Sequence, residues 1–352
     1  MSEKPVRVAI IGAGANTRSR HIPGFRAVAG VEIAGVVNRT HESSAQAARE
    51  FGIPKTYPAW QAVLDDPSVD AICIGTWPDL HCEITCAALA AGKHVLTEAR
   101  MARNAAEAQR MHAVSLAHPG FVAQVVPSPF GLEQNPFVQS LFEHSFIGQL
   151  REVVVIGAEP TFWDYTEFLH WRQDARISGL NVLALGILHE TVSRWIPPTT
   201  RVFAQTTCFE KQRPLANSQG LVDVTVPDSL QIVTLIDGGA RGVYHMSGVS
   251  LFGPGKQIHL YGSRGTIKYV MTPEERLWCG RPGDKELIPA EIPESLRGGW
   301  RVEAEFIAAI RGQDKIHYTD FATGVRYMEF TEAVARSAAL NLPVDLPLKN
   351  LG

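Results

Sequence analysis

The first third of the chain alternates short, β-branched apolar runs with longer segments rich in alanine and leucine. Short runs of this kind predict buried strands, whereas the longer segments predict helices. Strands and helices that alternate in this way form a parallel, doubly wound sheet, which is an α/β fold. The expected strands are residues 6–11, 31–37, 71–75, 94–97 and 121–126, and the expected helices are residues 21–28, 41–51, 80–91 and 105–117.

The pattern changes after Pro127-Ser128-Pro129. Most apolar runs beyond this point are strand-like, and several lie close enough in sequence to pair as antiparallel neighbours. The sequence therefore predicts two domains, residues 1–126 and residues 127–352, the second being an α+β domain built on an open sheet. Its expected strands are residues 149–157, 202–208, 229–237, 242–249 and 257–260, and the expected helices are residues 181–195, 300–311 and 323–341.

Composition narrows the class of protein. The 352 residues suffice for two domains, and 45% hydrophobic with 20% charged residues is typical of globular proteins. The net charge of −3 comes without a basic stripe, so we expect neither nucleic-acid nor membrane binding. Five cysteines without a CxxC pair predict free thiols, no metal site and a cytoplasmic location. No apolar stretch approaches the roughly 20 residues that cross a bilayer.

The first expected strand ends in a glycine turn, Gly12-Ala13-Gly14. Gly12 permits the tight bend, Gly14 lets the backbone approach a pyrophosphate, and the following helix presents free N–H groups to it. Thr17 stands where a third glycine or alanine usually lies, so the fingerprint is incomplete. Its position before a second strand nevertheless predicts dinucleotide binding.

The second expected strand ends at Asn38 and Arg39. An acidic residue at this place would bind the ribose 2′-hydroxyl of NAD. Asn38 does not repel a 2′-phosphate, and Arg39 is able to pair with one or to lie along the adenine. The sequence therefore predicts NAD or NADP and leaves the choice open.

Further segments carry a family resemblance. In the first domain they are Gly12-Ala13-Gly14, His21-Ile22-Pro23, Thr76-Trp77-Pro78-Asp79-Leu80-His81 and Ala91-Gly92-Lys93-His94-Val95-Leu96-Thr97-Glu98. In the second they are Trp171-Arg172, Tyr261-Gly262-Ser263-Arg264-Gly265-Thr266-Ile267 and residues 303–312 and 320–338. Their order and spacing resemble the glucose–fructose oxidoreductase, inositol dehydrogenase and rhizopine-catabolism (Gfo/Idh/MocA) family.

The resemblance implies a Rossmann domain followed by a domain with a large open, mostly antiparallel sheet. The nicotinamide of NAD or NADP would face that sheet, with Thr76, Trp77, His81 and Glu98 among the cofactor-binding residues. Family members act on sugars, cyclitols and related alcohols. Many pair through their open sheets, so a homodimer or homotetramer is expected.

The chain departs from the family at one acid–base position. The family usually reads Glu-Lys-Pro, whereas this chain has Glu98-Ala99-Arg100. Alanine transfers no proton, and arginine stays charged and is a poor base. Arg100 is expected either to hold an anionic or strongly polar substrate through paired hydrogen bonds or to turn outward or pair with Glu98.

The second family position is an Asp-x-Gly-x-His helix. Alignment on Gly186 puts Ala184 and Leu188 at the Asp and His positions, so His189 is one residue late. One residue is about 100° of helix rotation, and His189 is read either as the proton carrier or as a packing residue. On a continuous helix, Asn181 would share its face and contact the substrate.

Other polar residues belong to a segment that lines the substrate cavity by resemblance. Tyr165 and His170 are alternative proton carriers, and Trp171 and Arg172 are candidate substrate-binding residues. Arg172 is equally suited to stack on Trp171 and cap a helix.

Three functions fit these residues. The first is an NAD(P)-dependent oxidoreductase acting on a secondary alcohol of a sugar, cyclitol or related polyol. The second is an enzyme that cleaves glycosides through transient oxidation and elimination. The third is a sensor that binds NAD(P) and a sugar without catalysis, which loss of both acid–base positions would predict.

Overall fold

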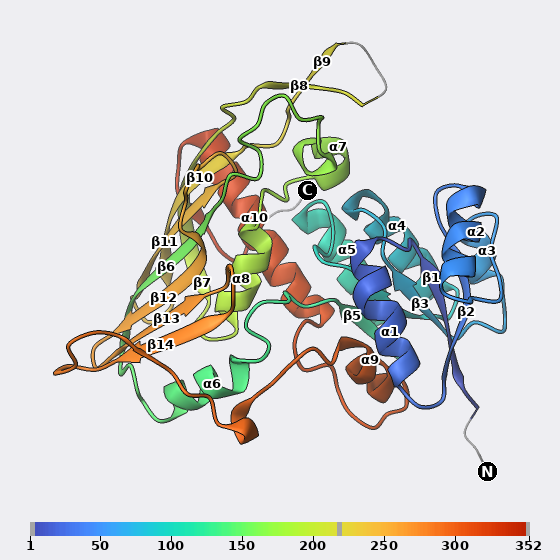
Figure 1. Cartoon of the computed structure of the whole chain (residues 1–352), viewed down its shortest axis with the longest axis horizontal. Helices are drawn as coiled ribbons and strands as arrows, with labels where there is room; N and C mark the ends of the chain where they lie inside the picture. Colours follow the sequence, from blue (N-terminus) through green and yellow to red (C-terminus); the bar gives the residue numbers. More distant parts are fainter. Residues whose placement is uncertain (1–3, 217–219, 350–352) are drawn as a thin grey trace. The chain divides into compact units, whose positions relative to one another are not determined.

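Parallel strands form the first sheet in the computed structural model, which describes residues 4–216 and 220–349 (Figure 1). In this part of the chain the sheet has five strands in the order β2-β1-β3-β4-β5. The order reverses direction at β1 and β3, the switch point where doubly wound sheets bind ligands. The strands are β1 (Val6–Ile11), β2 (Val31–Val37), β3 (Ala71–Ile74), β4 (His94–Thr97) and β5 (Ala123–Val125).

Helices connect these strands, as the sequence predicts. They are the π-helical turn η1 (Thr17–His21), α1 (Ile22–Ala27), α2 (His41–Glu50), α3 (Gln61–Leu64), α4 (Pro78–Ala90) and α5 (Ala105–Ala117). The helical segment after β1 begins at Thr17, earlier than the predicted residue 21. β3 and β4 are almost fully buried, which is why their apolar runs are continuous rather than alternating.

A nine-stranded sheet forms the second fold element within the described residues. Its order is β15-β14-β13-β12-β6-β11-β10-β7-β16, and every neighbouring pair is antiparallel except β6 with β11. The large open, mostly antiparallel sheet is therefore confirmed. Its strands are β6 (Leu150–Ala158), β7 (Thr199–Thr207), β10 (Ser229–Ile236), β11 (Arg241–Ser247), β12 (Gly255–Gly262), β13 (Thr266–Val270), β14 (Arg276–Gly280), β15 (Ile288–Pro289) and β16 (Val344–Asp345).

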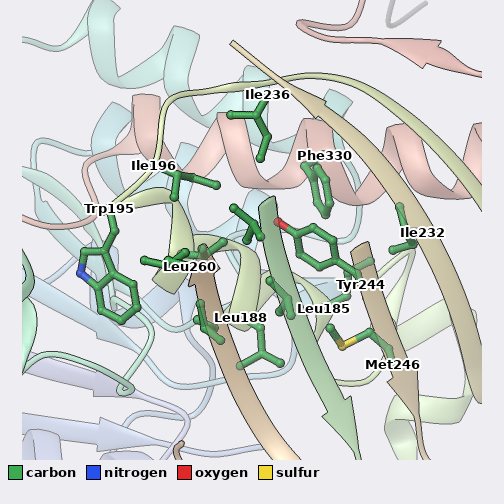
Figure 2. Close-up of a cluster of buried hydrophobic side chains, with 14 of the residues drawn as sticks. Leu185, Leu188, Trp195, Ile196, Ile232, Ile236, Tyr244, Met246, Leu260 and Phe330 are labelled. Atoms are coloured by element: carbon green, nitrogen blue, oxygen red, sulfur yellow. The ribbon is translucent and has the colours of Figure 1, made fainter. Parts of the chain in front are cut away.

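Helices cover one face of this sheet. Figure 2 shows the core they form, where Leu185 and Leu188 of α8 and Phe330 of α10 lie with Tyr244 and Leu260 of the strands. Strand positions alternate between buried and exposed, as expected for a sheet covered on one face only. The remaining elements are α6 (Asn135–Glu143), η2 (Trp171–Gln173), α7 (Ala175–Ser178), α8 (Leu185–Ser193), β8 (Gln212–Pro214), β9 (Leu221–Asp223), η3 (Glu294–Leu296), α9 (Val302–Ile310) and α10 (Phe321–Leu340).

The chain divides into two compact units. The first contains the residues up to Pro127 together with Arg301–Arg326, and the second contains Ser128–Trp300 and the residues from Tyr327 onward. The division lies next to the expected boundary at residue 126, but the structure places residues 301–326 with the first unit rather than the second. The reason is packing, because Phe306 of α9 meets Phe25 of α1 edge to face at 6.4 Å between ring centroids.

Two local differences concern the expected helix over residues 181–195. The helix α8 begins only at Leu185, because Leu183 has a left-handed backbone with φ of +47°. Asn181 therefore precedes the helix and does not share a helical face with His189, which corrects the sequence expectation. None of the helices in the described residues is long and apolar enough to span a membrane.

Candidate functional site

The glycine turn after β1 lies against the end of β3. Gly12 has a φ of +90°, and a Cβ there would lie 2.8 Å from the backbone of Gly75 and Thr76. A Cβ on Gly75 would overlap the Gly12 carbonyl and the Thr17 hydroxyl, which donates to that carbonyl at 3.1 Å. Glycines at both strand ends thus let the two backbones pack closely at the switch point, which is where dinucleotide-binding folds place the pyrophosphate.

Asn38 ties this turn to α2. Its Oδ1 accepts a hydrogen bond from the Ala13 N–H at 2.7 Å, and its Nδ2 donates to the Ser43 carbonyl at 2.9 Å. The backbone N–H of Asn38 donates to Ser44 Oγ at 2.8 Å. The carboxamide of Asn38 therefore spans the two segments that frame the end of β2.

Arg39 and Trp77 come together from the loops after β2 and β3. The guanidinium carbon of Arg39 lies 5.4 Å from the ring centroid of Trp77, within cation–π range. The indole of Trp77 is 38% exposed. The pair presents a flat cationic and aromatic surface beside the switch point, suited to an adenosine group.

Glu98 follows β4, at the same carboxyl edge of the sheet. Its carboxylate accepts hydrogen bonds from His21 Nε2 at 2.9 Å, Asn16 Nδ2 at 2.5 Å and the Ala99 N–H at 3.2 Å. Burial by itself raises the pKa of Glu98, but the hydrogen bond and charge of His21 outweigh it and the pKa falls below its usual value. Glu98 is therefore an ionised group that already holds several protein donors.

His81 and Arg100 are both buried in the first unit. The His81 ring lies between two carbonyl oxygens, with Nδ1 2.9 Å from that of Arg100 and Nε2 3.0 Å from that of Thr76. Burial lowers the pKa of His81, so the ring is neutral and donates to one carbonyl at a time. His81 thus joins the loops after β3 and β4. Arg100 is buried and does not turn outward to solvent, which was one of the three arrangements expected from the sequence.

His189 lies in the core of the second unit. Its ring stacks on Phe330 with centroids 3.5 Å apart, and its Nδ1 is 2.9 Å from the Tyr244 hydroxyl (the Tyr244–Phe330 pair is visible in Figure 2). Burial lowers the pKa of His189 to about 3 and raises that of Tyr244. The imidazole is therefore neutral, and its Nδ1 either donates to the Tyr244 hydroxyl or accepts from it.

The other predicted substrate residues have different environments. Asn181 is buried and donates through Nδ2 to the Ser178 carbonyl at 2.7 Å, so its amide closes the turn before α8. Tyr165 is 63% exposed. The two side chains therefore differ in their access to solvent, because Asn181 is fully buried and Tyr165 is mostly exposed.

His170, Trp171 and Arg172 are neighbours around η2. His170 Nδ1 accepts from the Arg172 N–H at 3.2 Å, which caps the short helix. The guanidinium carbon of Arg172 lies 4.3 Å from the Trp171 ring centroid. Arg172 therefore stacks on Trp171, which the sequence analysis gave as the alternative to substrate binding. Burial lowers the pKa of both His170 and Arg172.

Sequence reasoning missed several of these partners. No motif in the sequence marks Gly75, Asn16 or Tyr244 as a functional residue. His21 appears only as part of the His21-Ile22-Pro23 motif. Gly75 has a visible signal, because it directly follows the third strand, but Tyr244 lies in an ordinary alternating strand. Among the described residues, no group of three or more His, Cys, Asp or Glu side chains is arranged to hold a metal ion.

Comparison with known proteins agrees with this architecture. Residues 6–119 match the model of the oxidoreductase family GFO_IDH_MocA, with its NAD-binding Rossmann fold, and residues 137–268 match the GFO/IDH/MocA C-terminal domain. Levoglucosan dehydrogenase of Pseudarthrobacter phenanthrenivorans is 39% identical over 348 residues, covering 87% of each protein.

Two solved structures share the fold at 21% identity, each over 97% of this chain and 99% of the other. They are levoglucosan dehydrogenase in complex with NADH and L-sorbose, with a TM-score of 0.87, and in complex with NADH and levoglucosan, with a TM-score of 0.86. The family resemblance is thereby confirmed. The chain belongs to the Gfo/Idh/MocA family, as an NAD(P)-dependent oxidoreductase whose first domain is the family's NAD-binding Rossmann domain.

Proposed function

We propose that the protein is a dehydrogenase that oxidises a secondary alcohol of a sugar or a related polyol, or reduces the corresponding ketone. Binding of the cofactor is supported by the close approach of the Gly12 and Gly75 backbones at the switch point, where a Cβ on either glycine would overlap the other. A sugar or polyol as the substrate is supported by the 39% identical relative, which is named levoglucosan dehydrogenase.

The first unit offers a set of cofactor-binding residues that fits a dinucleotide. Gly12 and Gly14 would hold the pyrophosphate, with Thr17 supporting their turn through its hydrogen bond to the Gly12 carbonyl, while Arg39 and Trp77 would hold the adenosine. Asn38 places no carboxylate beside a 2′-phosphate, so NADP is proposed as acceptable along with NAD. When bound, the nicotinamide supplies the hydride acceptor or donor.

His189 is proposed as the group that accepts the hydroxyl proton. For this, Nδ1 must carry the hydrogen and donate to the Tyr244 oxygen, which leaves Nε2 as the acceptor. The low pKa of about 3 keeps this nitrogen unprotonated over the whole neutral range, and it also makes His189 a weaker base than a histidine with a pKa near neutrality. Tyr165 and His170 remain the alternative carriers, and Trp171 and Arg172 the proposed sugar-binding pair.

Arg100 is proposed to hold polar oxygens of the substrate. A guanidinium stays charged and offers several N–H donors in one plane, which suits paired hydrogen bonds to a carboxylate or to neighbouring hydroxyls. Ala99, which precedes it, contributes no acid–base group, so substrate orientation and proton transfer would come from different residues.

The experiment is a substrate screen with the purified protein and each cofactor. The panel contains levoglucosan, L-sorbose, inositols, common aldoses and glycosides with a coloured leaving group, and reduced nicotinamide is followed by absorbance. Net formation of NADH or NADPH with a sugar or polyol supports the proposal. Release of the aglycone without net reduction would replace it by glycoside cleavage, and tight cofactor binding without any turnover would replace it by a sensor.

We also propose a homo-oligomer formed through the uncovered face of the nine-stranded sheet. Val233, Leu235 and Val243 stand on that face with about half of their surfaces exposed. Arg241 and Glu152 lie beside one another on adjacent strands there. A two-fold axis would place each charge of one copy near its opposite in the other, around the apolar centre.

A further inference from the structure

A buried histidine lies between two carboxylates in the first unit. His21, the last residue of η1, has Nδ1 2.5 Å from Glu303 Oε1 and Nε2 2.9 Å from Glu98 Oε1. The side chain of His21 is completely buried, and that of Glu303 nearly so. Glu303 belongs to α9 and comes from 282 residues further along the chain, so folding alone brings the three groups together.

The contacts of both ring nitrogens with carboxylate oxygens favour a protonated ring. A neutral imidazole has one N–H and would direct a lone pair at one of the two carboxylates, whereas an imidazolium donates to both. Burial by itself lowers the pKa of His21, but the hydrogen bonds and charges of Glu303 and Glu98 outweigh it and raise the pKa to about 9. His21 is therefore a cation at neutral pH, flanked by two anions.

The other titratable groups near the carboxylates add no charge. Cys73 of β3 faces both carboxylates, and burial raises the pKa of its thiol well above the usual value. His81 of α4 faces Glu98, and burial lowers its pKa. At neutral pH both are uncharged, so the cluster of His21, Glu98 and Glu303 carries a net charge of about −1.

Glu98 connects the cluster to the cofactor edge. Besides His21, it accepts from Asn16, two residues beyond Gly14, and from the backbone of Ala99, which follows β4. The end of the glycine turn and the end of β4 are thus held by one carboxylate. His21 and Asn16 both donate to Oε1 of Glu98, and of these two donors only His21 brings a charge.

Gly24 of α1 leaves room for the Glu303 carboxylate. A Cβ on Gly24 would lie 2.5 Å from the carboxyl carbon and from Oε2 of Glu303. Phe25 packs on Phe306 one turn along α9, which anchors the helix beside this contact. The carboxylate of Glu303 therefore occupies the space that a side chain at position 24 would need.

We propose that His21 is a positioning residue for the dinucleotide: as a cation held by Glu303, it fixes Glu98 and thereby the segments at Asn16 and Ala99 that border the cofactor. This inference rests on the cofactor-binding residues proposed above. The protonated ring is the form that holds Glu98. Because folding raises the pKa of His21 from 6.5 to about 9, this contribution is complete below pH 6.5 and is lost as the pH rises through about 9.

The test measures the Kd of NADH by nicotinamide fluorescence, from near-neutral pH to about pH 10, for the full-length protein and two variants. Glu303→Gln removes one of the two anions that face His21. Glu305→Gln is the matched control, because Glu305 lies on the same helix but accepts from the His317 N–H instead. Wild type and the control should lose about tenfold in affinity above pH 9, which one charge-assisted hydrogen bond accounts for.

In Glu303→Gln the same loss should begin at least about one pH unit lower, since one supporting charge is gone. A constant Kd in wild type through pH 10, or equal midpoints for the two variants, would overturn the inference. Absence of NADH binding by wild type at every pH would overturn the cofactor-binding residues instead. If Glu303→Gln does not fold, ¹⁵N-histidine NMR of wild type at pH 8 decides: a ring with both nitrogens protonated supports the inference, and twelve neutral rings contradict it.

Discussion

The imidazole of His189 lies parallel to the ring of Phe330, with 3.5 Å between centroids and 3° between planes. Its neighbour Leu188, at the family's usual histidine position, is fully buried in the core. The single-residue offset thus places leucine in the apolar core and turns the histidine toward Tyr244, at a ring distance of 5.9 Å. A histidine that is stacked, buried and bonded to a phenol hydroxyl is a neutral group with a fixed ring orientation.

His189→Ala should lower kcat by about 10²–10⁴-fold, the contribution of a general base, while the Kd of NADH stays the same. His170→Ala is the comparison, since its ring caps η2 and should affect stability more than kcat. Steady-state kinetics with the substrate found in the screen measures both. Wild-type kcat in His189→Ala would move the proton-carrying role to Tyr165 or His170.

The pH dependence of kcat/KM provides a second measure of the same group. The acceptor must be unprotonated, and the pKa of His189 is lowered to about 3, so activity should be lost only as the pH falls through that value. The profile should therefore be flat on the acidic side down to about pH 5. A decline with a midpoint near 6 would indicate a less buried histidine and contradict this assignment.

Gly75→Ala should weaken cofactor binding and lower the melting temperature. The added Cβ would overlap the Gly12 carbonyl and force the ends of β1 and β3 apart. Gly120→Ala is the control, because nothing lies within 4 Å of a Cβ there. Calorimetry and NADH titration of both variants check the prediction. Equal Kd values would mean that the close approach of these strands is unrelated to the cofactor.

Asn38→Asp should shift cofactor preference toward NAD. A carboxylate would repel a 2′-phosphate, yet its oxygen could still accept from the Ala13 N–H. The other oxygen would face the Ser43 carbonyl, which now accepts from Nδ2, so we also expect a loss of about 1–3 kcal/mol in stability. The ratio of the NAD and NADP dissociation constants is the measurement. An unchanged ratio would show that another residue sets the preference.

Val243→Glu should convert the proposed oligomer to a smaller species without unfolding the chain. Val243 lies at the centre of the uncovered sheet face, where a buried charge in an interface is unfavourable. Light scattering gives the mass, and circular dichroism verifies the fold. Val270→Glu, on β13 of the same sheet, serves as a comparison away from the Val233, Leu235 and Val243 cluster. A wild-type monomer would contradict the proposed interface.

The local pattern of the sequence determined much of the first unit. Continuous apolar runs specified its buried strands, and the glycines after β1 marked the switch point, because both are properties of neighbouring residues. The break at Pro127 marked the end of this sheet for the same reason. The open sheet of the second unit could also be predicted, since its strands alternate between covered and uncovered faces.

Contacts between residues far apart in sequence were decided by the tertiary structure. Phe306 joins Phe25, so α9 belongs with the first unit, although it follows the whole nine-stranded sheet in sequence. The carboxylates of Glu303 and Glu98 raise the pKa of His21, whereas burial against Phe330 lowers the pKa of His189. A motif gives the residue type at a position, but the protonation state depends on which groups folding brings within about 3 Å and how much water it removes.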